Sequence, residues 1–83
     1  MVSNIWLRIP AGARYNKRDA HVESIQKIDL LYAYECRVIY GEFEDEEDSV
    51  LYDSPQRAAQ VYNDIVQKAI ATTGDLLYDM PLR

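Results

Sequence analysis

Apolar residues are spaced in two different ways along the chain, and the spacing predicts strands first and one helix later. Residues 4–9 form a short run rich in β-forming side chains, which Pro10 ends because proline cannot donate a hydrogen bond to a sheet. The β-branched and aromatic residues of 37–44 give the strongest strand pattern in the chain. Residues 49–53 follow after a short connection, so we expect them to pair antiparallel with the preceding strand.

The segment 22–34 fits neither spacing at its start. Apolar residues recur every three positions from Val22 to Ile28, whereas 30–34 have the composition of a strand. We predict a single bent or bulged strand over the whole segment. The alternative is a helical turn over 20–28 followed by a strand.

Three connections differ in composition. The segment 11–19 is basic and poor in apolar residues, which favours an exposed connection. Glu35 and Cys36 are expected to make a tight connection between two strands. Glu44 to Asp48 are five consecutive acidic residues, which repel one another and favour full solvation at a hairpin tip.

The helix has the most complete set of sequence features. Ser54 can cap it, Pro55 suits the first helical position, and Gly74 suits a left-handed stop. The apolar residues that recur at spacings of three and four, and that we expect to face the sheet, are Ala58, Val61, Tyr62, Ile65, Val66, Ala69 and Ile70. The tail 75–81 is too short for another helix and is expected to fold back as an edge strand or a docked strap.

These elements together predict an α+β fold, with a small antiparallel β-sheet of about four strands and one C-terminal amphipathic helix packed on one face. We expect residues 1–83 to form a single α+β domain. Most of the seven tyrosines are expected in the core or on the sheet, and Trp6 is expected to anchor the core.

The charge is distributed unevenly. Residues 1–18 carry four basic and no acidic side chains, so the rest of the chain has a net charge of −9 within a total of −5. An acidic chain is repelled by phosphate backbones, and we therefore expect no direct binding of nucleic acid. The basic segment still suits an acidic partner.

The compartment follows from features that the sequence lacks. A single cysteine, Cys36, cannot form an internal disulfide, which favours a reducing compartment. The first residues lack the pattern of a signal peptide, and no stretch has the apolar length of a membrane span. We therefore expect a cytoplasmic protein with no membrane contact.

Both ends of the chain and its helix resemble a known group of small proteins. The matching residues are Trp6, Leu7 and Arg8 for a W-[IL]-R start, then Arg57, Ala58, Val61 and Ile65 for the helix, then Tyr78, Met80 and Pro81 for the end. The group consists of uncharacterised proteins of low-GC Gram-positive bacteria, their prophages and their integrative elements. The resemblance implies a bacterial or mobile-element context, and it transfers no site because the group has no established activity.

No residue pattern predicts a catalytic, cofactor or metal site. Cys36 and His21 are the types of residue found in a thiol nucleophile and its base, but their spacing supports no mechanism. The acidic run lacks the alternating ligands and the turn glycine of a calcium-binding loop.

We therefore predict a non-enzymatic protein-interaction module with an acidic, tyrosine-bearing surface and an unknown protein partner. The residues expected at that surface are Glu42, Glu44, Asp45, Glu46, Glu47, Asp48, Tyr40 and Tyr52. A sharper version is an inhibitor of a host nucleic-acid-binding protein, with the carboxylates in place of phosphates. The alternative is a small enzyme or metal-binding module that uses Cys36, His21 and the acidic loop. A homodimer formed through an exposed sheet edge is compatible with either hypothesis.

Overall fold

The computed structural model describes residues 2–15, 18–19, 22–42 and 47–83, and it confirms the predicted α+β class. The elements are β1 (Val2–Ile9), β2 (Arg14–Tyr15), β3 (Arg18–Asp19), β4 (Ser24–Ile28), β5 (Leu30–Tyr34), β6 (Arg37–Gly41), β7 (Asp48–Leu51), α1 (Pro55–Ala71) and β8 (Gly74–Asp79). Within these ranges no helix has both the length and the apolar character needed to cross a membrane.

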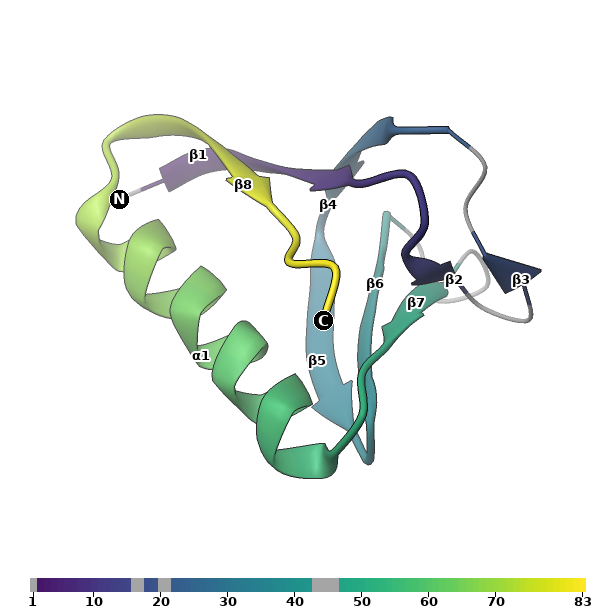
Figure 1. Ribbon diagram of the computed structural model, residues 1–83. Helices are drawn as coiled ribbons and strands as arrows, with labels where there is room; N and C mark the ends of the chain where they lie inside the picture. Colours follow the sequence, from purple (N-terminus) through teal and green to yellow (C-terminus); the bar gives the residue numbers. More distant parts are fainter. Residues whose placement is uncertain (1, 16–17, 20–21, 43–46) are drawn as a thin grey trace.

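The strands form two sheets, where the sequence predicted one of about four strands. Sheet A has the order β4-β1-β8, with β8 parallel to β1, and sheet B has the order β3-β2-β7-β6-β5. In Figure 1 sheet A, sheet B and α1 lie like the three sides of a triangle around the core. The helix therefore covers the space between two sheets instead of one face of a single sheet.

A bend at Asp29 explains why the sheet is split. The chain pairs with β1 as far as Ile28, then turns at Asp29 and pairs with β6 from Leu30 onward. The predicted bend in 22–34 is thus correct, but it separates two strands that belong to different sheets. A helical turn before residue 28 is wrong for the described part, because β4 already begins at Ser24.

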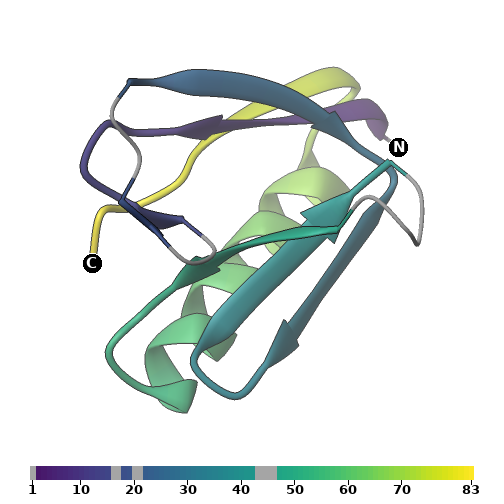
Figure 2. The same ribbon diagram turned by 90° about the vertical axis from the view of Figure 1, so that its right-hand side faces the viewer.

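The segment 11–19 differs from its prediction, and the C-terminal tail matches one of its two predicted alternatives. Residues 14–15 and 18–19 of the segment 11–19 form the short strands β2 and β3, which pair with each other, so the described part of this segment is more regular than the predicted exposed connection. Ala13 within it is fully buried. The tail forms β8 at the edge of sheet A, which confirms the edge-strand alternative (Figure 2).

The core lies where the inner faces of both sheets meet α1. Its largest fully buried side chains are Tyr40, Leu7, Ile9, Ile65, Val38, Val50 and Val61. Leu7 and Ile9 alternate with half-buried positions along β1, and the half-buried Ile39 separates Val38 from Tyr40 on β6. This period of two is expected for strands that have one buried face.

Trp6 does not anchor the core, contrary to the prediction. It lies between Leu7 and the half-buried Ile5 on β1, so strand alternation turns it to the outer face of sheet A. Its neighbours across the strands are Lys27 on β4 and Leu77 on β8. The run of apolar residues at 5–7 hid this alternation, because one of three consecutive apolar side chains had to face outward.

The helix begins as predicted and extends over 17 residues to Ala71, with Thr72 as its C-cap. Ser54 Oγ accepts a hydrogen bond from the backbone N–H of Arg57 at 3.1 Å, and Pro55 is the first helical residue. At the other end the Thr72 hydroxyl donates to the carbonyl of Lys68 at 2.6 Å. Gly74 has the expected positive φ of +90°, but it starts β8 instead of stopping the helix.

Candidate functional site

The described part of the predicted acidic surface is exposed only in part. Glu42 and Glu47 are exposed, whereas Asp48 is half-buried at the start of β7. Glu44, Asp45 and Glu46 lie outside the described residues. Two carboxylates of the predicted group are therefore placed where a partner can reach them.

The two predicted surface tyrosines belong to the core. Tyr40 is 0% exposed and Tyr52 is 3% exposed. The Tyr52 hydroxyl donates to the backbone carbonyl of Pro81 at 3.0 Å, and burial raises the pKa of this phenol well above its ordinary value. A partner cannot contact these side chains without displacing the core, so Tyr40 and Tyr52 do not form the predicted surface.

Two other tyrosines are exposed on β5. Tyr32 is 37% exposed and Tyr34 is 62% exposed. Their partners across the hairpin are Ile39 and Arg37, while Leu31, the residue before Tyr32, packs against the core. The alternation of β5 was visible in the sequence, but alternation alone does not tell which of its two faces is covered by the helix.

Tyr32 is hydrogen-bonded to Glu47, the residue that precedes β7. Its hydroxyl donates a hydrogen bond to Glu47 Oε2 at 2.8 Å. This bond raises the pKa of Tyr32 above its ordinary value, and desolvation and the negative charge of Glu47 add to the effect. The phenol therefore stays protonated and remains a hydrogen-bond donor.

Exposed carboxylates lie at both ends of the β5–β6 hairpin that carries these two tyrosines. Asp29 precedes β5, Glu35 follows it, Glu42 follows β6, and Glu47 binds Tyr32, and all four are exposed. Arg37 is the basic side chain beside Tyr34. We call Tyr32, Tyr34, Asp29, Glu35, Glu42 and Glu47 the tyrosine face.

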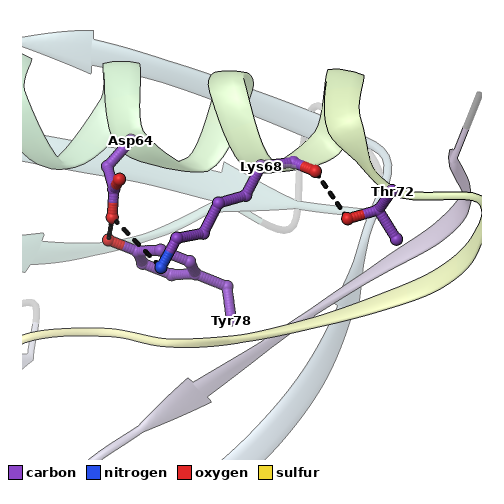
Figure 3. A network of polar contacts seen from close by, with 4 residues as sticks. All are labelled: Asp64, Lys68, Thr72 and Tyr78. Atoms are coloured by element: carbon purple, nitrogen blue, oxygen red, sulfur yellow. Dashed lines mark hydrogen bonds and ion pairs between the residues drawn. The ribbon is translucent and has the colours of Figure 1, made fainter.

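A second candidate lies between α1 and β8, where polar side chains line a groove of about 500 Å³. Tyr78 donates its hydroxyl hydrogen to Asp64 Oδ2 at 2.7 Å (Figure 3). Lys68 Nζ lies 3.7 Å from the same carboxylate oxygen and 5.2 Å from the centre of the Tyr78 ring. We call this space the polar groove.

The polar side chains of this groove make contacts that stabilise the fold. Burial raises the pKa of Tyr78 well above its ordinary value, and the hydrogen bond to Asp64 raises it further, so the phenol is neutral at physiological pH. Arg57 donates through Nε and Nη2 to the carbonyl of Arg83, at 3.0 and 2.8 Å. These groups bind one another and fasten the segment after β8 to the helix.

The residues of the enzyme hypothesis are not brought together in the described part of the chain. Cys36 is half-buried in the turn between β5 and β6, and its carbonyl accepts a hydrogen bond from Tyr52 N at 2.7 Å. His21 lies outside the described residues. Over the described ranges, no group of three or more His, Cys, Asp or Glu side chains is placed to hold a metal ion.

Comparisons of the chain with protein-family models, with curated proteins and with solved structures found no match. The resemblance of its ends to the bacterial and prophage group therefore stays a prediction.

Proposed function

We propose that this chain is a non-enzymatic protein-interaction module that binds a basic region of a protein partner through the tyrosine face. The observation that supports this proposal is the exposure of Tyr32 and Tyr34 on a hairpin whose ends carry exposed carboxylates, with Glu47 bound to Tyr32. Tyrosine is enriched at binding hot spots because its ring gives a large contact area at a low cost in conformational entropy. The surrounding carboxylates favour a partner of opposite charge.

The net charge of −5 supports a protein partner over a nucleic acid, because an acidic surface is repelled by phosphate groups. In the sharper version of the proposal, the partner is itself a nucleic-acid-binding protein. Its basic cleft would accept the carboxylates of the tyrosine face in place of phosphates. The resemblance of the chain ends to bacterial and prophage proteins makes a host protein the first class of partner to test.

The proposal can be tested with a photo-reactive amino acid in place of Tyr34, in cells that naturally express the chain. Benzoylphenylalanine retains an aromatic ring at this position, and illumination should link it to a discrete protein. The matched control carries the same probe at Gln67, which is exposed on the helix. The same adducts at both positions, or none at Tyr34, would contradict the proposal.

Once a partner is captured, association kinetics test the role of charge. Glu47→Gln removes one charge from the tyrosine face and keeps an acceptor for Tyr32. It should slow association several-fold at low ionic strength and reduce the salt dependence, because clustered charge acts mainly on the encounter rate. Asp79→Asn is the control, since Asp79 is exposed at the end of β8 and pairs with Arg8 on sheet A. Equal effects of the two variants would count against the tyrosine face.

A further inference from the structure

An opening lies between the start of β1 and β5, and residues of α1 form its floor. β1 pairs with β4 as far as Ile5 and Ile28, and its first residues pair with β8 alone among the described strands. β5 pairs with β6 alone within the same ranges. One side of β1 at residues 2–4 and one side of β5 therefore lack a neighbouring strand in the described part of the chain.

The opening is an apolar groove of about 410 Å³. The residues that line it are Val2, Ile5, Leu31, Ile65, Val66, Ala69 and Ile70. A smaller hollow of about 190 Å³ between 2–5 and 28–31 shares Val2, Ile5 and Leu31 with it. The groove thus extends along the start of β5 toward the bend at Asp29. We call the larger, aliphatic hollow the apolar groove.

The edge of β5 at this groove presents backbone hydrogen-bonding groups. Only Glu35 and Cys36 separate Tyr34 from Arg37, and a turn of this length is flanked by a pair that exchanges both backbone hydrogen bonds. Hydrogen-bonded pairs then alternate along the hairpin. The N–H and C=O groups of Leu31 and Ala33 are consequently directed away from β6, toward the side where a further strand can be added.

Charge distinguishes between two possible occupants of this edge. If a second copy paired antiparallel with β5 in full overlap, Tyr32 would face Tyr32, and Glu35 of each copy would lie beside Asp29 of the other. Like charges opposite one another destabilise a strand pair, and each copy carries a net charge of −5. A strand with basic residues at both ends would instead place opposite charges beside Asp29 and Glu35.

We propose that the apolar groove binds an extended segment of the partner protein as an added strand on β5, with alternating apolar side chains and basic flanks. This inference rests on the proposed function and names the partner's chemistry. Strand addition takes its affinity from backbone hydrogen bonds and its specificity from pockets that receive alternate side chains. Here one set of side chains enters the groove beside Leu31, and the other set lies along Tyr32 and Tyr34 on the tyrosine face.

A displayed peptide library tests this proposal directly. Random peptides of about nine residues, long enough to cover β5 and both flanks, are selected on the folded protein. We expect enrichment of sequences with apolar residues at every second position and Lys or Arg at the ends. In nuclear magnetic resonance, a selected peptide should slow amide exchange at Leu31 and Ala33 by at least about tenfold, because those N–H groups become hydrogen-bonded.

Two variants locate the binding. Ile70→Gln changes a groove residue that is 70% exposed, and its matched control is Val22→Gln, at a residue 72% exposed outside the groove. Ala33→Pro removes an N–H that β6 does not use, which edge strands tolerate. The selected peptides should lose at least about tenfold in affinity with Ile70→Gln and Ala33→Pro and keep it with Val22→Gln.

Other results would overturn strand addition. A library that yields no binders would do so, as would selected peptides whose affinity is unchanged by Ile70→Gln and Ala33→Pro. A dimer seen in analytical ultracentrifugation that Ile70→Gln abolishes would identify a second copy of the chain as the occupant. Binding of a fluorescent apolar dye that Ile70→Gln abolishes, without any selected peptide, would point to a small apolar ligand instead. A partner captured at Tyr34 that ignores the groove variants would overturn this inference and leave the proposed function standing.

Discussion

The helix α1 borders two grooves of similar volume and opposite character. The polar groove beside β8 contains charged and phenolic side chains that bind one another, as the contacts among Asp64, Lys68 and Tyr78 show. The apolar groove beside β1 and β5 is lined by aliphatic side chains and lies next to a strand edge that no described strand covers. The groove on one side of α1 is thus filled by contacts within the chain, whereas the groove on its other side remains accessible.

The difference explains why we base the proposed binding site on the apolar groove and not on the polar groove. The polar groove has the residue types of an active site, yet each of them already has a structural partner within the chain. The apolar groove has no reactive group, but its aliphatic lining and strand edge remain available. The proposed strand addition therefore uses the groove whose binding groups are not already occupied by other residues of the described chain.

The largest effect is expected at the boundary between the core and the apolar groove. Ile65 is 0% exposed and also lines the groove, so Ile65→Ala should lower the free energy of unfolding by about 2–4 kcal/mol through lost burial and a residual cavity. Chemical denaturation measures this change. A change below about 0.5 kcal/mol would mean that the groove collapses at no cost and that its shape is not fixed.

The next effect concerns the polar side of the helix at high pH. The pKa values of Tyr52 and Tyr78 are raised in the folded state, so their contribution to stability is complete below the unfolded value of about 10 and is lost as the pH rises through the folded values. Unfolding free energy should fall above pH 10, by at most about 1.4 kcal/mol per pH unit for each tyrosine. Denaturation at pH 8 to 11 measures the slope.

The matched control for that slope is the variant with Tyr52→Phe and Tyr78→Phe. It should flatten the fall above pH 10, because neither ring can then ionise. A slope that persists in this variant would assign the alkaline loss to other groups and would weaken the structural interpretation of the polar groove.

A smaller effect compares two phenol–carboxylate hydrogen bonds. Tyr78→Phe removes the part-buried bond to Asp64 and should cost about 0.5–1.5 kcal/mol, while Tyr32→Phe removes the exposed bond to Glu47 and should cost less. Thermal or chemical denaturation of the two variants gives the order. The reverse order would mean that Tyr32 fastens β5 to β7 and is part of the fold instead of a free binding surface.

The smallest effect is an expected gain in stability at the end of β5. Glu35 has a φ of +52°, a left-handed conformation that costs an L-residue roughly 1–2 kcal/mol. Glu35→Gly should therefore raise the free energy of unfolding by about 0.5–1 kcal/mol, after the larger entropy loss of glycine is subtracted. Glu35→Ala is the control for the lost charge and should give no such gain.

The sequence predicted correctly those elements for which the local residue pattern and the tertiary packing favour the same structure. Ser54, Pro55 and the spacing of Val61 and Ile65 predicted the helix start and its buried face, and the short connection between β6 and β7 determined their antiparallel pairing. Ile70 was expected to face the sheet and is exposed instead, since the stripe near the end of the helix borders the open groove.

The candidate site was less predictable because it depends on which face of each strand is covered. Alternation shows that Tyr32 and Tyr34 share one side of β5, but the position of α1 decides that this side is outside. The same applies to Tyr40 and Tyr52, whose burial depends on both sheets. The split at Asp29 was also hidden, because a bent strand in one sheet and two strands in two sheets have the same local sequence pattern.

Sheet A joins residues that are far apart in the chain, and this affects how the protein folds during synthesis. Asn4 on β1 binds Asp75 on β8 across 71 residues, and β8 pairs directly along β1. Closing so long a loop is entropically costly, and it can happen only after the ribosome has released β8. Until then β1 lacks one neighbour and the core is open on that side. Co-translational folding should therefore be completed late, in one step that seats β8 and covers Leu7 and Val61 together.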